Sequence, residues 1–167
     1  MSLITLDFET YYTDDGLGFK KQTTEEYIRD PRFEVIGVAV QVDDAEPVWF
    51  SGDRESIRKW LDQFDWKNSA ALAHNMLFDG AILHWHFGIT PMVMLDTLCM
   101  ARALHGVDVG GSLKALAERY QVGVKGNEVV EAINKRRVEW NGTLWHKRDF
   151  CAIHEDVHHA EGFGSFR

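Results

Sequence analysis

The order of its short apolar segments is the sequence feature that most restricts how this chain can fold. Three strand-like segments come first, at residues 3–8, 33–42 and 47–50. Their brevity and their β-branched residues are typical of strands. Two further segments of this kind, 69–73 and 92–95, alternate with stretches whose apolar residues recur at helical spacing. This order predicts an α/β fold with a central mixed five-stranded sheet flanked by helices on both faces.

Capping residues indicate where the helices begin. Thr23 and Glu26 have the spacing of a capping box, ahead of a short helix that Pro31 would end. Asp53 and Asn75 are expected N-caps of two longer helices. The helices predicted in this way span residues 23–30, 53–64, 75–86, 97–105, 112–120, 128–137 and 147–160.

Length and charge restrict the function classes. A chain of 167 residues is long enough for one domain with a hydrophobic core, and residues 1–167 are expected to form a single domain. The formal net charge of −8 argues against a general nucleic-acid-binding protein, which carries a basic surface. This net charge is compatible with a nuclease whose acidic site is neutralised by metal ions.

The sequence shows no sign of export or of membrane insertion. No apolar run approaches the length of a membrane-spanning helix, and the first residues lead directly into a strand-like segment. Cys99 and Cys151 lie far apart and have no CxxC spacing, so reduced thiols are expected. These features predict a cytoplasmic protein with no membrane partner.

Two carboxylates stand at the end of the first predicted strand. Asp7 and Glu9 are two residues apart, so both side chains project from one face while Phe8 faces the other way. Two such close carboxylates repel one another, and a divalent cation such as Mg²⁺ or Mn²⁺ would hold both ionised. Taken alone, the pair is explained equally well as a solvated strand end.

A third carboxylate follows the strand at 69–73. Asn75 is placed to cap the next helix, and Asp79 lies four residues further on the same helical face. A carboxylate one turn into a helix that starts at the edge of a sheet can meet those on a neighbouring strand. Phe78 could wedge against a nucleobase, although a core position is at least as well supported for that ring.

These motifs resemble those of a known superfamily. The DxE pattern at Asp7–Glu9 and the N-x3-D pattern at Asn75–Asp79 are similar to the first two motifs of the DEDD exonucleases. The likeness is strongest to the proofreading domain of phage and prophage family A DNA polymerases, and it covers roughly residues 3 to 137. The matching segments are 24–37 (TEEYIRDPRFEVIG), 73–82 (AHNMLFDGAI), 95–97 (LDT), 101–102 (AR) and 111–117 (GSLKALA).

The resemblance implies an RNase H-like sheet and a 3′→5′ exonuclease that hydrolyses phosphodiester bonds with two Mg²⁺ or Mn²⁺ ions. It implies that Asp7 bridges both ions, Glu9 binds one of them and Asp79 acts from the opposite side. It also makes Phe8, Thr10, Asn75 and Phe78 candidate substrate-binding residues. Single-stranded DNA 3′ ends are the implied substrate, with RNA as an alternative. The implied setting is a bacterial or phage-infected cell.

No segment resembles the fingers, palm or thumb of a polymerase, so a separate polymerase is a candidate partner. The C-terminal part, residues 138–167, departs from the family pattern. The third motif of the family is Y-x3-D or H-x4-D, and an alignment on Asp156 places Ala152 where the tyrosine belongs. An alignment on Phe150 instead places His154 at the aspartate position, and six helical residues turn by about 600°, so both alignments cannot hold. Asp156 is the preferred fourth catalytic residue and metal ligand.

Two other functions remain open. A degraded third motif would fit an exonuclease-like domain that binds nucleic-acid ends or a partner without efficient hydrolysis. The pattern His154-Glu155-x-x-His158 matches the zinc-protease motif HExxH. That function needs a third zinc ligand, but Glu161 and Gly164 stand where the metzincin pattern requires glycine and histidine. The zinc protease is therefore a remote alternative.

Overall fold

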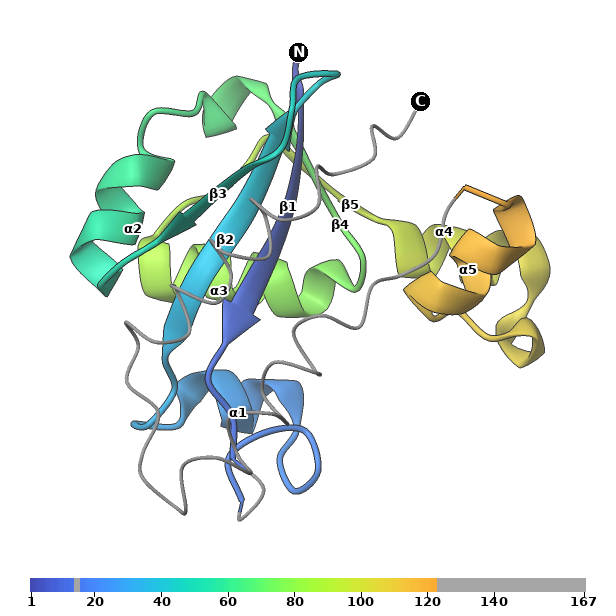
Figure 1. The fold of residues 1–167 in the computed structure, drawn as a ribbon, viewed down its shortest axis with the longest axis horizontal. Helices are drawn as coiled ribbons and strands as arrows, with labels where there is room; N and C mark the ends of the chain where they lie inside the picture. Colours follow the sequence, from blue (N-terminus) through green and yellow to red (C-terminus); the bar gives the residue numbers. More distant parts are fainter. Residues whose placement is uncertain (14–15, 123–167) are drawn as a thin grey trace, which may run out of the picture. The chain divides into compact units, whose positions relative to one another are not determined.

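The computed structural model describes residues 1–13 and 16–122 (Figure 1). Two compact units make up the chain, residues 1–109 and residues 110–167. The predicted helices at 128–137 and 147–160 lie outside the described residues, as does Asp156.

A mixed five-stranded sheet forms the first unit, with strand order β3-β2-β1-β4-β5. The pairs β1–β2 and β2–β3 are antiparallel, whereas β1–β4 and β4–β5 are parallel. The strands are β1 (Leu3–Thr10), β2 (Val35–Val42), β3 (Val48–Ser51), β4 (Ala70–Ala73) and β5 (Val93–Asp96). The prediction of an α/β fold with a mixed five-stranded sheet flanked by helices is confirmed.

The hydrophobic core lies on the face of the sheet that alternate residues of β1 occupy. Ile4, Leu6 and Phe8 are buried there, together with Val38 and Val40 of β2. Helices α2 (Arg54–Leu61) and α3 (Met76–Phe87) pack on the sheet and contribute buried residues to the same core. Each buried aliphatic or aromatic side chain stabilises the fold by about 1.5–3 kcal/mol, so this layer holds the strands in register.

The N-terminal caps follow the sequence signals closely. Helix α1 (Thr24–Arg29) begins with the predicted capping box, in which the Glu26 N–H donates to Thr23 Oγ1 (3.3 Å) and the Thr23 N–H donates to Glu26 Oε2 (2.9 Å). Asp53 caps α2 by accepting from the Ser56 N–H at 2.7 Å. Such caps contribute about 1 kcal/mol each.

The remaining described elements are two α-helices and two short 3₁₀ turns. In the first unit, α4 (Thr97–His105) follows β5, and the 3₁₀ turns span Trp66–Asn68 and Val107–Val109. In the second unit, α5 (Leu113–Tyr120) is capped by Ser112, whose side chain accepts from the Ala115 N–H at 3.2 Å. Within residues 1–13 and 16–122, no helix has the length and apolarity needed to span a membrane.

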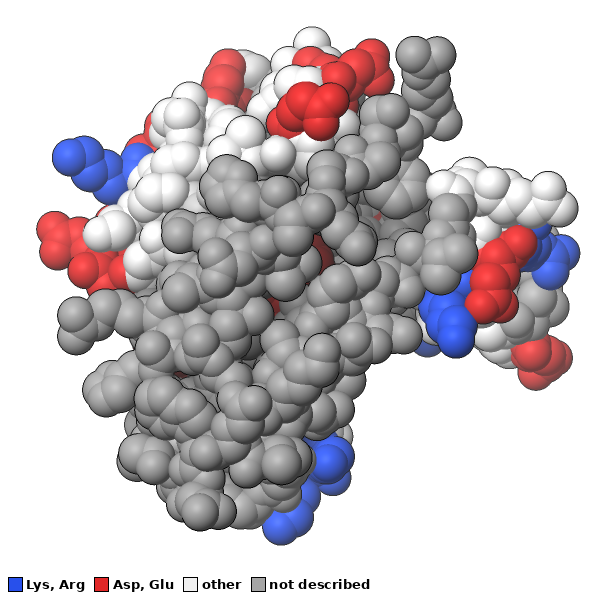
Figure 2. Space-filling model, viewed as in Figure 1, with Lys and Arg blue, Asp and Glu red and all other residues white. Residues whose placement is uncertain are grey.

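Charge is distributed unevenly over the first unit. Figure 2 shows acidic side chains at the end where β2 turns into β3, a turn that contains Asp43, Asp44 and Glu46. Basic side chains are visible at the opposite end, where α1 lies.

Candidate active site

Strand β1 presents Asp7 and Glu9 on the face of the sheet opposite the core. Asp7 is exposed and Glu9 is half-buried, whereas Phe8 between them is only 4% exposed and stacks on Phe87 at 5.7 Å. The predicted alternation along this strand is therefore confirmed. The pairing register places Asp7 beside Ala39 and Glu9 beside Gly37 on β2, so small residues flank both carboxylates on that side.

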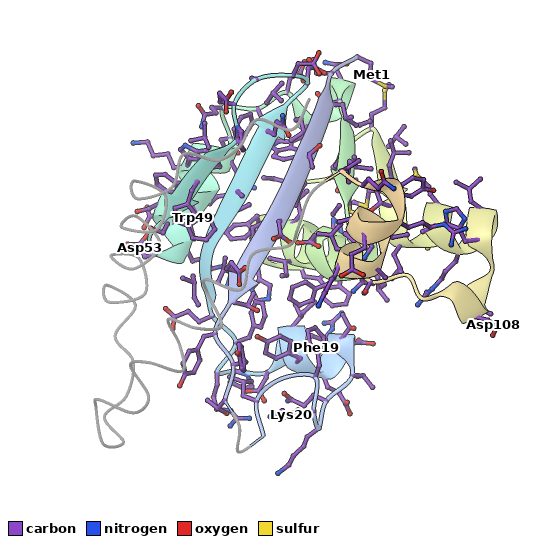
Figure 3. The ribbon with its side chains drawn as sticks, turned by 45° about the vertical axis from the view of Figure 1, so that its right-hand side comes forward. Met1, Phe19, Lys20, Trp49, Asp53 and Asp108 are labelled. Atoms are coloured by element: carbon purple, nitrogen blue, oxygen red, sulfur yellow. The ribbon has the colours of Figure 1, made fainter. Side chains whose placement is uncertain are left out.

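Gly37 lies beneath an aromatic ring that the sequence did not single out. A Cβ atom at position 37 would overlap the indole of Trp49 on β3 and would lie 2.7 Å from the Phe50 carbonyl oxygen. Gly37 pairs with Glu9 on one side and with Ser51 on the other, so the Trp49 ring lies over the strand that neighbours Glu9. Figure 3 labels Trp49 on the β3 side of the sheet. The requirement for glycine at position 37 is a packing requirement at the edge of the candidate site.

We expect Gly37→Ala to destabilise the fold by about 1–3 kcal/mol, because the added methyl group must displace the Trp49 ring or the β3 backbone. Urea unfolding would measure the change. The matched control is the same substitution made in a Trp49→Leu background, where the destabilisation should be smaller. An equal loss in both backgrounds would show that the indole is not the obstacle.

Helix α3 brings the third predicted carboxylate to β1. Asp79 is 2% exposed, and its Oδ1 accepts a hydrogen bond from the Phe8 N–H at 2.9 Å. Strand β4 pairs with β1 only from Leu3 to Thr5, so further along that edge a β1 N–H needs another acceptor. The Asp79 carboxylate supplies that acceptor, and it does so at the residue between Asp7 and Glu9.

The environment of Asp79 favours its protonated form. Burial raises the pKa of this carboxyl to about 8, and the charges of Asp7 and Glu9 add to the rise, while the Phe8 N–H opposes it. Among the described residues, no lysine, arginine or histidine forms an ion pair with Asp79. The three carboxylates are therefore close enough to repel one another, without a basic side chain to balance Asp79.

The carboxylates do not form a ready-made metal centre. Within the described part of the chain, no group of three or more His, Cys, Asp or Glu side chains could hold a metal ion as placed. Asp7, Glu9 and Asp79 surround one backbone position, Phe8, but their oxygens do not converge on a single point. Asp156, the predicted fourth ligand, lies outside the described residues, and so does the HExxH segment of the zinc-protease alternative.

The four predicted substrate-binding residues occupy different environments. The Phe8 ring belongs to the core, so only its backbone serves the site. Thr10 accepts a hydrogen bond from the Tyr27 hydroxyl at 2.8 Å. Phe78 is half-buried, packs against the core and stacks on Tyr27 at 6.2 Å, which places it at the boundary between core and site.

Asn75 occupies the N-cap position of α3, but the prediction that its side chain caps the helix is wrong. Its backbone is left-handed, with φ of 74°, and its side chain makes no capping hydrogen bond. Asparagine tolerates this conformation better than most residues, so the chain can turn sharply from β4 into α3. The Asn75 N–H donates instead to Asp96 Oδ1 at 3.1 Å.

Asp96 is a structural residue to which the sequence motifs assign no catalytic role. It ends β5 and caps α4, accepting from the Leu98 N–H at 2.8 Å in addition to the Asn75 N–H. Burial raises the pKa of Asp96, but hydrogen bonds from Cys99, Leu98 and Asn75 outweigh it and leave the pKa below its usual value. One ionised carboxylate therefore ties the start of α3 to the start of α4.

Tyr27 also joins the site, although no sequence pattern indicated it. Its hydroxyl donates to Thr10 Oγ1 and to the Tyr11 carbonyl oxygen, both at 2.8 Å. Burial raises the pKa of Tyr27 to about 12, the Thr10 hydrogen bond opposes the rise, and the charge of Glu9 adds to it. Tyr27 therefore lies close to Glu9 and fixes the end of β1.

Comparison of the sequence with protein-family models and with curated proteins finds no match. The chemistry of the site is therefore argued from its residues and their geometry.

Proposed function

We propose that this chain is a divalent-metal-dependent 3′→5′ exonuclease with an RNase H-like fold that removes nucleotides from single-stranded DNA ends. The observation that carries the proposal is the position of Asp79, buried on α3 and hydrogen-bonded to β1 between Asp7 and Glu9. Asp79 thereby meets Phe8, which is 71 positions earlier in the chain, and three carboxyl groups gather at one end of β1. The charges of Asp7 and Glu9 help to raise the pKa of Asp79, and a divalent cation would relieve this repulsion.

The donor set fits the proposed ions. All three side chains offer carboxylate oxygens, which are the ligands that Mg²⁺ and Mn²⁺ prefer. The strand order and the mixed pairing of the sheet are compatible with an RNase H-like fold. The sequence resemblance to the first two DEDD motifs involves the same three residues and agrees with the proposal.

Each carboxylate has a distinct part in the proposed site. Asp79 is held by the Phe8 N–H and cannot move without breaking that hydrogen bond. Asp7 and Glu9 lie on the face of β1 opposite the core, where Asp7 is exposed and Glu9 is half-buried. A bound divalent ion would offset their repulsion and supply the charge stabilisation and activated water that phosphodiester hydrolysis requires. Without such an ion, the negative charges of Asp7 and Glu9 would repel a phosphate group.

The test of the proposal is the digestion of a 5′-labelled single-stranded oligonucleotide. Progressive shortening that requires Mg²⁺ or Mn²⁺ would support a 3′→5′ exonuclease. Binding of the oligonucleotide without shortening would favour the alternative of an exonuclease-like binding domain. Cleavage of peptides that depends on zinc, and is not supported by Mg²⁺ or Mn²⁺, would instead favour the zinc protease.

Mg²⁺ or Mn²⁺ is also expected to stabilise the folded protein. An ion that binds only the folded state adds RT ln(1 + [L]/Kd), which is about 2.7 kcal/mol at an ion concentration 100 times Kd. Thermal unfolding with EDTA and then with increasing Mg²⁺ would measure the rise in melting temperature. The rise should be lost in Asp7→Asn and retained in Asp44→Asn, since Asp44 lies in the β2–β3 turn. An equal rise in both variants would indicate ion binding elsewhere.

A further inference from the structure

The loop that follows β1 is held in place by its own hydrogen bonds. Leu17 is 1% exposed, and its carbonyl oxygen accepts from the Thr13 N–H at 2.9 Å. The Gly18 N–H donates to Gln22 Oε1 at 2.8 Å, and Gly18 has φ of 125°, a conformation that favours glycine. The residue that follows this glycine, Phe19, is therefore presented on an anchored segment.

Phe19 is 58% exposed although it touches two other aromatic rings. Its ring meets Tyr27 at 5.1 Å and Phe78 at 5.3 Å, both edge to face. Figure 3 shows Phe19 beside α1, beyond the end of β1. The hydroxyl of Tyr27 donates a hydrogen bond to Thr10, which follows Glu9 in the chain. Phe78 immediately precedes Asp79. The exposed ring therefore lies next to the carboxylate site.

Two basic side chains follow the exposed ring, while Asp14 and Asp15 leave residues 11–22 as a whole without net charge. Lys20 and Lys21 follow Phe19 directly, and both are exposed in a chain whose net charge is −8. Figure 3 shows Lys20 beyond Phe19 at the outer edge of this loop. An exposed aromatic ring next to basic side chains is the combination by which proteins bind single-stranded nucleic acid, because every base offers a face for stacking.

We propose that Phe19 stacks on a base of the single strand whose 3′ end enters the carboxylate site, while Lys20 and Lys21 attract its phosphates. This inference rests on the proposed function, since it takes Asp7, Glu9 and Asp79 as the point of hydrolysis. Stacking of this kind does not read sequence, so the subsite serves any base. The competing explanation is structural: the Phe19 ring could serve only to cover Tyr27 and Phe78.

The experiment compares Phe19→Leu with the unchanged protein on two labelled oligonucleotides. One is an ordinary single strand, and the other lacks the bases of its last three nucleotides. Binding is measured by fluorescence anisotropy with Ca²⁺ in place of Mg²⁺, so that hydrolysis does not consume the probe. Leucine keeps an apolar contact with Tyr27 and Phe78 and preserves the fold, which the melting temperature would verify.

Phe19→Leu should weaken binding of the ordinary strand by about fivefold to 50-fold, with little effect on the abasic strand. Phe19→Tyr, which keeps a ring, should bind as the unchanged protein does. In hydrolysis, Phe19→Leu should raise KM and leave kcat within about twofold. The matched control is Trp85→Leu, because Trp85 is another exposed aromatic residue, whose ring is covered by the Arg29 guanidinium at 4.3 Å.

An equal loss on both oligonucleotides, or no loss on either, would overturn the stacking role of Phe19. Hydrolysis by the unchanged protein would then still support the exonuclease. A further outcome is that Phe19→Leu weakens binding of the base-bearing strand alone while the unchanged protein hydrolyses neither oligonucleotide. That result would support the stacking role and contradict the proposed activity. If the unchanged protein binds neither strand, the stacking role is overturned.

Discussion

Replacing Asp7 with asparagine is expected to lower the Mg²⁺-dependent hydrolysis of single-stranded DNA by about 10³-fold. The amide has the size of the carboxylate but carries no charge, so it removes stabilisation worth several kcal/mol from a metal-assisted reaction. Asp7 is exposed on β1, and its backbone pairing with Ala39 does not depend on the side chain, so the fold should persist. Glu9→Gln should have a similar effect. Initial rates and circular dichroism would measure activity and fold.

Asp44→Asn is the matched control, because it removes the same charge from an exposed position in the β2–β3 turn. Its rate should stay within about twofold of the unchanged protein. If Asp7→Asn is as active as the control, the carboxylate site is not the point of hydrolysis. If the unchanged protein binds oligonucleotides without hydrolysing them, the exonuclease-like binding domain becomes the better description.

The sheet could be predicted because its strands carry local signals. The alternation of Ile4, Leu6 and Phe8 with polar residues fixes which face of β1 is buried, and the same alternation places Asp7 and Glu9 together. Helix positions followed from caps such as Thr23 and Asp53, whose hydrogen bonds are local.

The hydrogen bond between Asp79 and Phe8 could not be predicted in the same way. Helical spacing placed Asp79 on the same face as Asn75, but the bond depends on where β4 stops pairing with β1, which is a tertiary property. The left-handed backbone of Asn75 has a similar origin, since Asp96 from a different strand accepts its N–H. Sequence spacing predicts the face of a helix or strand on which a side chain lies. Contacts between segments far apart in the sequence determine its hydrogen-bond partner.

The loop around Phe19 had no periodic pattern from which its placement could be inferred. Its position depends on the burial of Leu17 and on contacts with Tyr27 and Phe78, which come from two different helices. The close approach of the Trp49 ring to Gly37 is likewise a contact between strands, and the sequence shows only a glycine in a strand. A glycine at such a position is a usable signal, because it often marks the close approach of another group.

Asp79→Asn is expected to change how stability depends on pH. In the folded protein the Asp79 carboxyl keeps its proton until about pH 8, whereas its ordinary pKa, which applies in the unfolded chain, is 3.8. Between these values the folded state holds more protons than the unfolded state, so stability falls as pH rises, by up to about 1.4 kcal/mol per pH unit. Asparagine cannot titrate, and its side-chain oxygen can still accept the Phe8 N–H. The variant should therefore be more stable than the unchanged protein at pH 8.

Urea unfolding at pH 4, 6 and 8 in the presence of EDTA would measure this difference, with Asp44→Asn as the control that should follow the unchanged protein. The advantage of Asp79→Asn should grow from pH 4 to pH 8, and a constant advantage would contradict the titration of Asp79 in this range. Mg²⁺ at pH 8 should then reduce the difference in free energy of unfolding between the two proteins. A cation binds the ionised carboxylate of Asp79 more strongly than it binds the neutral amide of asparagine. If Mg²⁺ stabilises both proteins equally, Asp79 is buried close to Asp7 and Glu9 but takes no part in binding the ion.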